Sequence, residues 1–152
     1  MIRAEVSQSL LRGGSRLPQV EVDRVLRVMS RMLNVRTPIT LSIAFVSSST
    51  MKQLNSQFRG KPRPTDVLSF VHEPAVISAR NGGFLGEILL CYQIARRQAF
   101  RLDHSVRDEL LFLIVHGVLH LFGHDHERAV DAKRMYTLQT RILTSLRIDT
   151  RL

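Results

Sequence analysis

The spacing of apolar and polar residues predicts a mixture of helices and strands. Strict alternation over residues 39–45 is typical of a half-buried strand, with the apolar set Ile39, Leu41, Ile43 and Phe45. Two short apolar runs, Val67–Val71 and Glu87–Cys91, predict buried strands. Because helices and strands do not alternate strictly, we expect an α+β fold with a small mixed sheet of about four strands and about five helices.

Four of these helices follow from apolar residues at helical spacing. The first covers Glu21–Leu33, with Val22, Val25, Leu26, Met29 and Leu33 on its inner face. The second begins near three candidate capping residues, Ser48, Ser49 and Thr50, buries Met51, Leu54 and Phe58, and is broken by Gly60–Pro64. The others cover Gln93–Phe100 and Asp131–Leu146, and the last buries Met135, Leu138, Ile142 and Leu146. Gly13–Ser15 and Asn81–Gly83 are expected turns within one domain spanning residues 1–152.

The strongest helix prediction is Ser105–Phe122. Ser105 and Asp108 resemble a capping box, and Gly123 is well placed to end the helix. The stretch Leu110–Phe122 is apolar on nearly every side, so we expect this helix to lie in the core.

Composition and charge narrow the functional class. Apolar residues make up 44% and charged residues 23% of the chain, which favours an ordinary globular domain over a disordered one. The single cysteine, Cys91, excludes an internal disulfide and a cysteine-rich zinc site. The net charge of +9 indicates a polyanionic partner, although two tyrosines and no tryptophan argue against binding mainly by base stacking. No signal peptide or membrane span is expected, which places the protein in the cytoplasm.

Four of the six histidines lie between positions 116 and 126. His116 and His120 project from the same face of the predicted buried helix, and Gly123 turns the chain back so that His126 can approach them. Burying two unpaired imidazoles on an apolar helix would cost free energy. The spacing therefore predicts a catalytic Zn²⁺ bound by three histidines, with a fourth position for water. His124 is a weaker candidate for a fourth ligand.

The same histidine spacing occurs in metzincin proteases, which carry a glutamate beside the first histidine as general base. Here Gly117 occupies that place, so the residue that would activate water in a zinc peptidase is missing. The other histidines, His72 and His104, are expected at a strand edge and in a local turn.

A basic loop precedes the predicted strand at Val67. Arg59 lies where a helix ends, so its guanidinium is a candidate to bind a phosphate in bidentate fashion. Lys61 and Arg63 either add phosphate affinity or belong to a solvated basic turn. Asp66 is expected to orient the backbone or an imidazole of the metal site. Further along, a set of arginines forms either an RNA-facing stripe or separate surface charges: Arg96, Arg97, Arg101 and Arg107.

Three segments carry a family resemblance: Asn55–Phe70, which contains Thr65-Asp66-Val67-Leu68-Ser69-Phe70, Gly86-Glu87-Ile88, and His116–His126. Together they resemble the YbeY family of bacterial endoribonucleases over most of the chain. The resemblance implies a zinc-dependent, single-strand-specific ribonuclease that matures ribosomal RNA, notably the small-subunit 3′ end, and acts in ribosome quality control. It also implies that His116, His120 and His126 bind one zinc ion and that Arg59 is a functional arginine.

Two other functions are compatible with these residues. One is a ribosome-assembly factor that binds pre-ribosomal particles through its basic face and holds a structural zinc, although structural sites are usually closed by a fourth ligand. The other is a zinc peptidase, which Gly117 disfavours. The attacking group of the ribonuclease reaction, water or the substrate 2′-hydroxyl, is left open.

Overall fold

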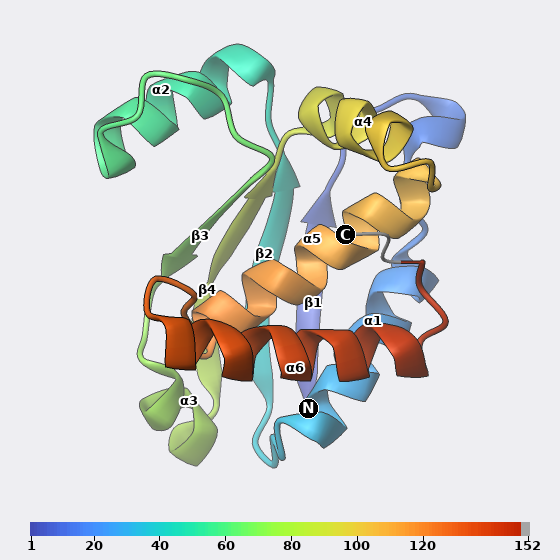
Figure 1. Cartoon of the computed structure of the whole chain (residues 1–152). Helices are drawn as coiled ribbons and strands as arrows, with labels where there is room; N and C mark the ends of the chain where they lie inside the picture. The colour runs from blue at the N-terminus through green and yellow to red at the C-terminus, as the bar shows by residue number, and fades with distance from the viewer. Residues whose placement is uncertain (150–152) are drawn as a thin grey trace.

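The computed structural model describes residues 1–149, and a four-stranded mixed sheet forms its centre (Figure 1). The strands are β1 Ile2–Ser7, β2 Ile39–Phe45, β3 Val67–Val71 and β4 Gly83–Leu90. Their order in the sheet is β1-β2-β4-β3. β1 and β4 each pair in parallel with β2, whereas β3 pairs antiparallel with β4. This order places β3, and the loop that leads into it, at one edge of the sheet.

Six α-helices are found in the described residues. They are α1 Gln19–Met32, α2 Ser48–Arg59, α3 Ala75–Asn81, α4 Tyr92–Arg101, α5 Val106–Leu121 and α6 Ala129–Ser145. Helices α1, α5 and α6 lie on one face of the sheet, and α6 packs over α5 (Figure 1). Helices α2 and α4 directly follow β2 and β4, so both lie at the end of the sheet where those strands finish.

The core has two parts, one on each face of the sheet. The larger part surrounds α5, which contacts the sheet, α1, α4 and α6, so a helix that is apolar on nearly every side is buried as predicted. The smaller part lies on the opposite face and contains Met51, Leu68, Leu89 and Cys91. Alternation along β4 supplies both parts, because Ile88 and Leu90 face the larger core while Leu89 faces the smaller one.

The predicted α+β fold with a small mixed sheet is confirmed. β2 and β3 have the predicted bounds, and the five predicted helices are all present with ends shifted by a few residues. Ser105 caps α5 by accepting a hydrogen bond from the Asp108 backbone N at 3.0 Å. The Asp108 carboxylate does not complete a standard capping box, because it bonds to Arg107 and to the Asp149 backbone N.

Two elements were missed by the sequence patterns. β1 alternates Ile2, Ala4 and Val6 with polar residues, but it is an edge strand that is stabilised by parallel pairing with β2, 37 positions along the chain. Helix α3 has only seven residues and lies between Pro74 and Gly82, too short a segment for helical periodicity to be read. β4 also begins at Gly83 rather than at Glu87.

Two details of α2 differ from the prediction. Its cap is Ser47, whose hydroxyl accepts a hydrogen bond from the Thr50 backbone N at 3.2 Å, and not Ser48, Ser49 or Thr50. Phe58 is 58% exposed and packs edge-on against Phe70, with ring centroids 5.1 Å apart, so it lies outside the buried face. Phe58 lies near the C-terminal end of α2, past Met51 and Leu54, which are the α2 residues that join the smaller core.

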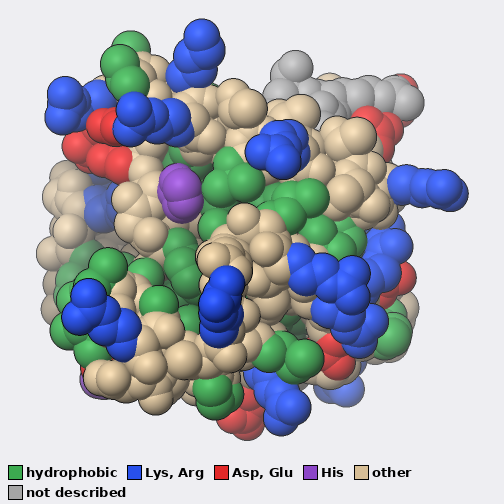
Figure 2. Space-filling view, turned by 90° about the horizontal axis from the view of Figure 1, so that it is seen from below, with side chains coloured by type: hydrophobic (Ala, Val, Ile, Leu, Met, Phe, Trp, Pro, Cys, Tyr) green, Lys and Arg blue, Asp and Glu red, His purple; other side chains and the backbone are tan. Residues whose placement is uncertain are grey.

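The positive charge is distributed over the surface. On the face seen in Figure 2, Lys and Arg side chains stand in several separate places, and acidic side chains lie beside some of them. Within residues 1–149, no helix combines the length and apolar character needed to cross a membrane.

Candidate metal centre

Three histidines converge at the C-terminal end of α5. His116 and His120 lie on one face of the helix, one turn apart, and their Nε2 atoms are 3.0 Å apart. Gly123, with φ of 86°, reverses the chain after α5 and brings back His126. One nitrogen from each of the three rings lies within 4.8 Å of the others. The structure therefore brings together the three histidines that the spacing selects.

Helix α6 orients two of these rings. Gln139, which is 1% exposed, accepts a hydrogen bond through Oε1 from His116 Nδ1 at 2.9 Å. That bond directs the lone pair of His116 Nε2 toward the other two imidazoles. One turn earlier on α6, the ring of Tyr136 stacks on His126 with centroids 6.1 Å apart. Neither α6 residue was predicted, because Gln139 and Tyr136 are not metal ligands and nothing in their sequence spacing relates them to the histidines.

The protonation states favour metal binding. Burial lowers the pKa of His116, and burial together with the neighbouring imidazoles lowers the pKa of His120 to about 4. Both rings are therefore neutral near pH 7, the form in which the ring nitrogen binds a metal. Two neutral imidazoles and the nearby exposed His126 form a donor set that fits a divalent transition metal.

The turn that carries His126 is held by a carboxylate. Asp125 accepts hydrogen bonds from the backbone N atoms of His126, at 2.7 Å, and of Glu127, at 3.3 Å. These bonds lower the pKa of Asp125. His124 is part-buried, but it is not among the three residues whose ligand atoms converge. The weaker prediction of His124 as a fourth ligand is therefore not supported by the geometry.

The three histidines line a cleft of about 550 Å³ that the basic loop also lines. Arg59, Lys61 and Arg63 all border this cleft, although they come from the end of α2 and the loop before β3. Gly60 ends α2 in the left-handed conformation, and the buried Asn55 donates a hydrogen bond to the Arg63 backbone O at 2.8 Å. Gln98 and Arg101 of α4 also line the cleft.

Asp66 orients the backbone at the start of β3. Its carboxylate accepts hydrogen bonds from the Val67 backbone N at 2.8 Å and from the Thr65 hydroxyl at 3.1 Å. Its backbone O also accepts a hydrogen bond from the Cys91 backbone N at 2.9 Å. Asp66 therefore ties β3 to the start of α4, the two elements that frame one side of the cleft.

Comparison with known proteins gives the family. A sequence model described as Endoribonuclease YbeY matches residues 15–147. The chain belongs to the Endoribonuclease YbeY family. The Endoribonuclease YbeY of Renibacterium salmoninarum is 39% identical over 136 residues, which is 87% of each chain. That of Staphylococcus saprophyticus is 34% identical over 128 residues, 82% of this chain and 84% of its own length.

A solved structure has a similar fold. The solution structure of TM1509 from Thermotoga maritima superposes with a TM-score of 0.61 at 28% identity, and covers 96% of this chain and 89% of that chain. The predicted family resemblance is confirmed, and with it the class of enzyme, an RNA-cleaving hydrolase.

Gly117 is a packing residue in this YbeY-family chain. A Cβ atom added there would lie 3.0 Å from Ile88 Cγ2 and 3.2 Å from Ser69 Oγ, because α5 approaches the sheet closely at this point. The Ser69 hydroxyl donates a hydrogen bond to the Gly117 backbone O at 3.3 Å. A side chain at position 117 would thus face the sheet and not the histidines, which agrees with the absence of a peptidase-type glutamate.

The remaining histidines have structural surroundings. The His104 side chain is buried and hydrogen-bonds to the buried Glu109, in the first turn of α5. Burial raises the pKa of Glu109, while its bond to His104 opposes that shift. His72 is exposed beyond the end of β3 and packs on Phe84, as predicted for a strand-edge residue.

Proposed function

We propose that this chain is a zinc-dependent endoribonuclease that cuts single-stranded RNA. The observation that carries this proposal is the shared cleft, in which three imidazoles and four cationic side chains line one hollow, although they come from distant parts of the sequence. The substrate we propose is ribosomal RNA, chiefly the 3′ end of the small-subunit RNA, in the cytoplasm. Action on ribosomal particles and a role in ribosome quality control belong to the same proposal, with residues 1–152 acting as one catalytic domain.

In this proposal His116, His120 and His126 hold one Zn²⁺. When bound, zinc supplies a Lewis acid and lowers the pKa of water toward about 7. Gln139 keeps His116 in the tautomer whose Nε2 faces the cluster, and Tyr136 limits the orientations of His126. The open, solvent-exposed side of His126 leaves room for a substrate group.

Arg59 is the proposed catalytic cation. Its guanidinium is planar and offers paired N–H donors that match two phosphate oxygens. Because Arg59 lines the same cleft as the histidines, it would stabilise the negative charge that builds on the phosphate as the bond to the leaving oxygen breaks. Lys61 and Arg63 bind neighbouring phosphates through charge alone.

The nucleophile is either water or the adjacent 2′-hydroxyl of the RNA. The two routes leave different ends on the product. Attack by the 2′-hydroxyl leaves a 2′,3′-cyclic phosphate, whereas attack by water leaves a linear phosphate. Mass spectrometry of the first-formed fragments distinguishes them.

The proposal is tested with purified protein on single-stranded and double-stranded RNA. We expect the wild type to cut single-stranded RNA and metal analysis to find one zinc per chain. His116→Ala, Arg59→Glu and chelator-treated wild type should leave the RNA intact. Re-addition of zinc should restore the chelated wild type but not His116→Ala.

Two outcomes would contradict the proposal. If the wild type, the two variants and the chelated wild type all gave the same background degradation, the protein would have no nuclease activity of its own. Retained zinc and binding to ribosomal particles, with no cleavage, would favour the ribosome-assembly factor instead.

A further inference from the structure

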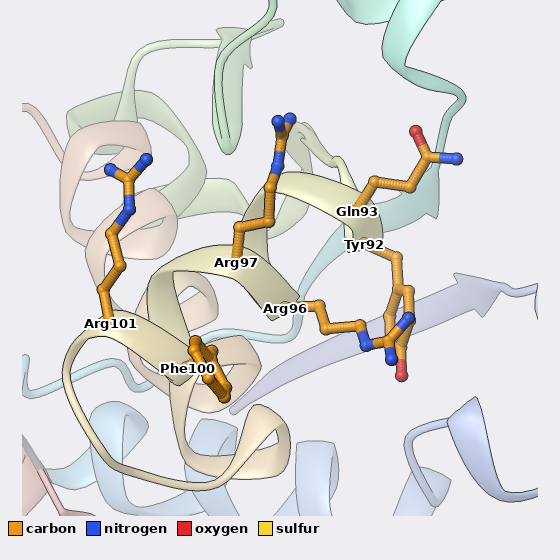
Figure 3. A pocket seen from close by; sticks show the side chains of 6 residues that line it. All are labelled: Tyr92, Gln93, Arg96, Arg97, Phe100 and Arg101. Atoms are coloured by element: carbon orange, nitrogen blue, oxygen red, sulfur yellow. The ribbon is translucent and has the colours of Figure 1, made fainter.

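Helix α4 carries a second basic surface beside the metal cleft. Residues four apart share a face of a helix, so its exposed side chains form two adjacent rows. One row is Gln93, Arg97 and Arg101, and the other is Tyr92, Arg96 and Phe100. These six side chains line a hollow of about 600 Å³, here called the α4 patch (Figure 3).

Phe100 is the most unusual member of the α4 patch. It is 88% exposed, more than any other large apolar side chain in residues 1–149. The opposite face of α4 is anchored in the protein through the buried Ala95 and Ala99, so the helix holds the Phe100 ring outward. An exposed aromatic ring on the same helix as three arginines provides a surface on which a planar group can stack.

The arginines of the α4 patch are not neutralised within the protein. None of the ion pairs found among residues 1–149 involves Arg96, Arg97 or Arg101. Arg107, which the sequence analysis grouped with them, differs because it pairs with Glu21 at 2.7 Å and with Asp108 at 2.6 Å. The predicted arginine stripe therefore reduces to the three residues on α4, and these face solvent as free positive charges.

The α4 patch adjoins the metal cleft through one shared residue, Arg101, which lines both hollows. Gln98 of the same helix also lines the cleft. Arg97 and Arg101 extend in the same direction from the helix (Figure 3). Side chains one helical turn apart are separated by about 5–6 Å at Cβ, a spacing that suits successive phosphates of an extended strand.

We infer that the α4 patch is a subsite for single-stranded RNA that continues from the metal cleft, with Phe100 stacking on a base and Arg97 and Arg101 binding phosphates. The inference rests on the proposed function, since it extends the path of the same substrate. RNA is favoured over an acidic protein because the patch shares Arg101 with the cleft and because every nucleobase has a face that stacks on an aromatic ring. The low aromatic content of the chain is compatible with this, because one ring beside three cations is sufficient.

The test compares cleavage of two oligoribonucleotides, a short one confined to the metal cleft and a long one that also reaches α4. Phe100→Ala should raise KM for the long RNA by about tenfold and leave kcat unchanged. The short RNA should be cut as by the wild type. Phe100→Tyr should restore the low KM because it keeps a ring, whereas Phe100→Leu should resemble Phe100→Ala.

Charge is tested separately with a matched pair of variants. Arg97→Gln should weaken cleavage of the long RNA and reduce the dependence of KM on salt, because one phosphate contact is lost. Arg27→Gln removes another exposed arginine, on α1, and should change neither KM nor its salt dependence. Melting temperatures confirm that these surface variants remain folded.

Wild-type KM on the long RNA for both Phe100→Ala and Arg97→Gln would overturn the inference. If those variants then lost binding to ribosomal particles, the patch would dock a protein instead. If the KM of Phe100→Leu were as low as that of Phe100→Tyr, stacking of a base on the ring would be excluded. These outcomes leave the proposed nuclease intact, whereas absence of any zinc-dependent cleavage by the wild type would defeat the proposed function itself.

Discussion

The two walls of the cleft are built in different ways. On one wall, His116 and His120 project from α5, which is packed between the sheet and α6, and Gln139 fixes one of the rings. On the other wall, Arg59 stands exposed at the end of α2, and the loop that follows is tied down by Asn55. Metal ligands must be positioned within fractions of an ångström, whereas a long cationic side chain can adjust to a flexible phosphate strand. The rigid wall therefore determines where the reaction occurs, and the exposed wall collects the substrate.

The largest effect is expected on the rigid wall. His120→Ala removes one of three converging nitrogens, so bound metal and RNA cleavage should both be lost. His124→Ala is the matched control, since this neighbouring histidine lies outside the cluster and should retain metal and activity. Mass spectrometry measures the metal content of both variants. Equal metal content would contradict the placement of His120 inside the cluster and His124 outside it.

A smaller effect is expected from the residue behind His116. Gln139→Leu removes the acceptor for His116 Nδ1 and should weaken metal affinity by about 10- to 100-fold. Gln139→Glu keeps an acceptor at the same place and should bind metal more tightly than the leucine variant. Titration with a competing chelator gives both affinities. Equal affinities for the wild type and the leucine variant would show that packing alone orients the ring.

The contact between α5 and the sheet is tested through stability. Gly117→Val pushes a branched side chain against Ile88 and Ser69, and should lower the free energy of unfolding by about 1–3 kcal/mol. Gly14→Ala, where nothing lies within 4 Å of the added Cβ, should change it by less than about 0.5 kcal/mol. Denaturant unfolding measures the difference, and a fully stable Gly117→Val would contradict the close approach.

The smallest effect is expected from Lys61, in the loop that follows Arg59 on the exposed wall. Lys61→Gln should raise KM for RNA by no more than about fivefold, because single exposed charges contribute little. The effect should shrink at high salt, where screening already weakens the contact. A loss as large as that of Arg59→Glu would show that Lys61 takes part in the reaction itself and does not only bind a phosphate.

The metal site could be predicted because its determinants are local. His116, His120 and His126 lie within 11 positions, and helical geometry with one glycine turn is enough to bring them together. Gln139 and Tyr136 could not be found in this way, since they reach the site only through the packing of α6 on α5. Arg101 was predicted only as a member of a stripe or as a surface charge, and its place in the cleft depends on how α4 follows β4.

The secondary structure shows the same difference between features that are set locally and features that depend on distant parts of the chain. α5 and β2 have long, regular patterns that reflect burial directly, and both were predicted with nearly their observed bounds. β1 owes its existence to a partner strand far along the chain, and α3 is too short to show a period. Ser47 caps α2 one residue before the predicted candidates, because several adjacent hydroxyl residues offer the same chemistry and only backbone conformation selects among them.

The burial of α5 has a consequence for how the protein acquires its ion. The helix is secured by an extensive apolar core that does not include the three imidazoles, so the chain should reach its native state before any metal arrives. Loading then becomes a separate, reversible event after synthesis. In the proposed zinc enzyme, the chain without its ion would therefore be folded but inactive.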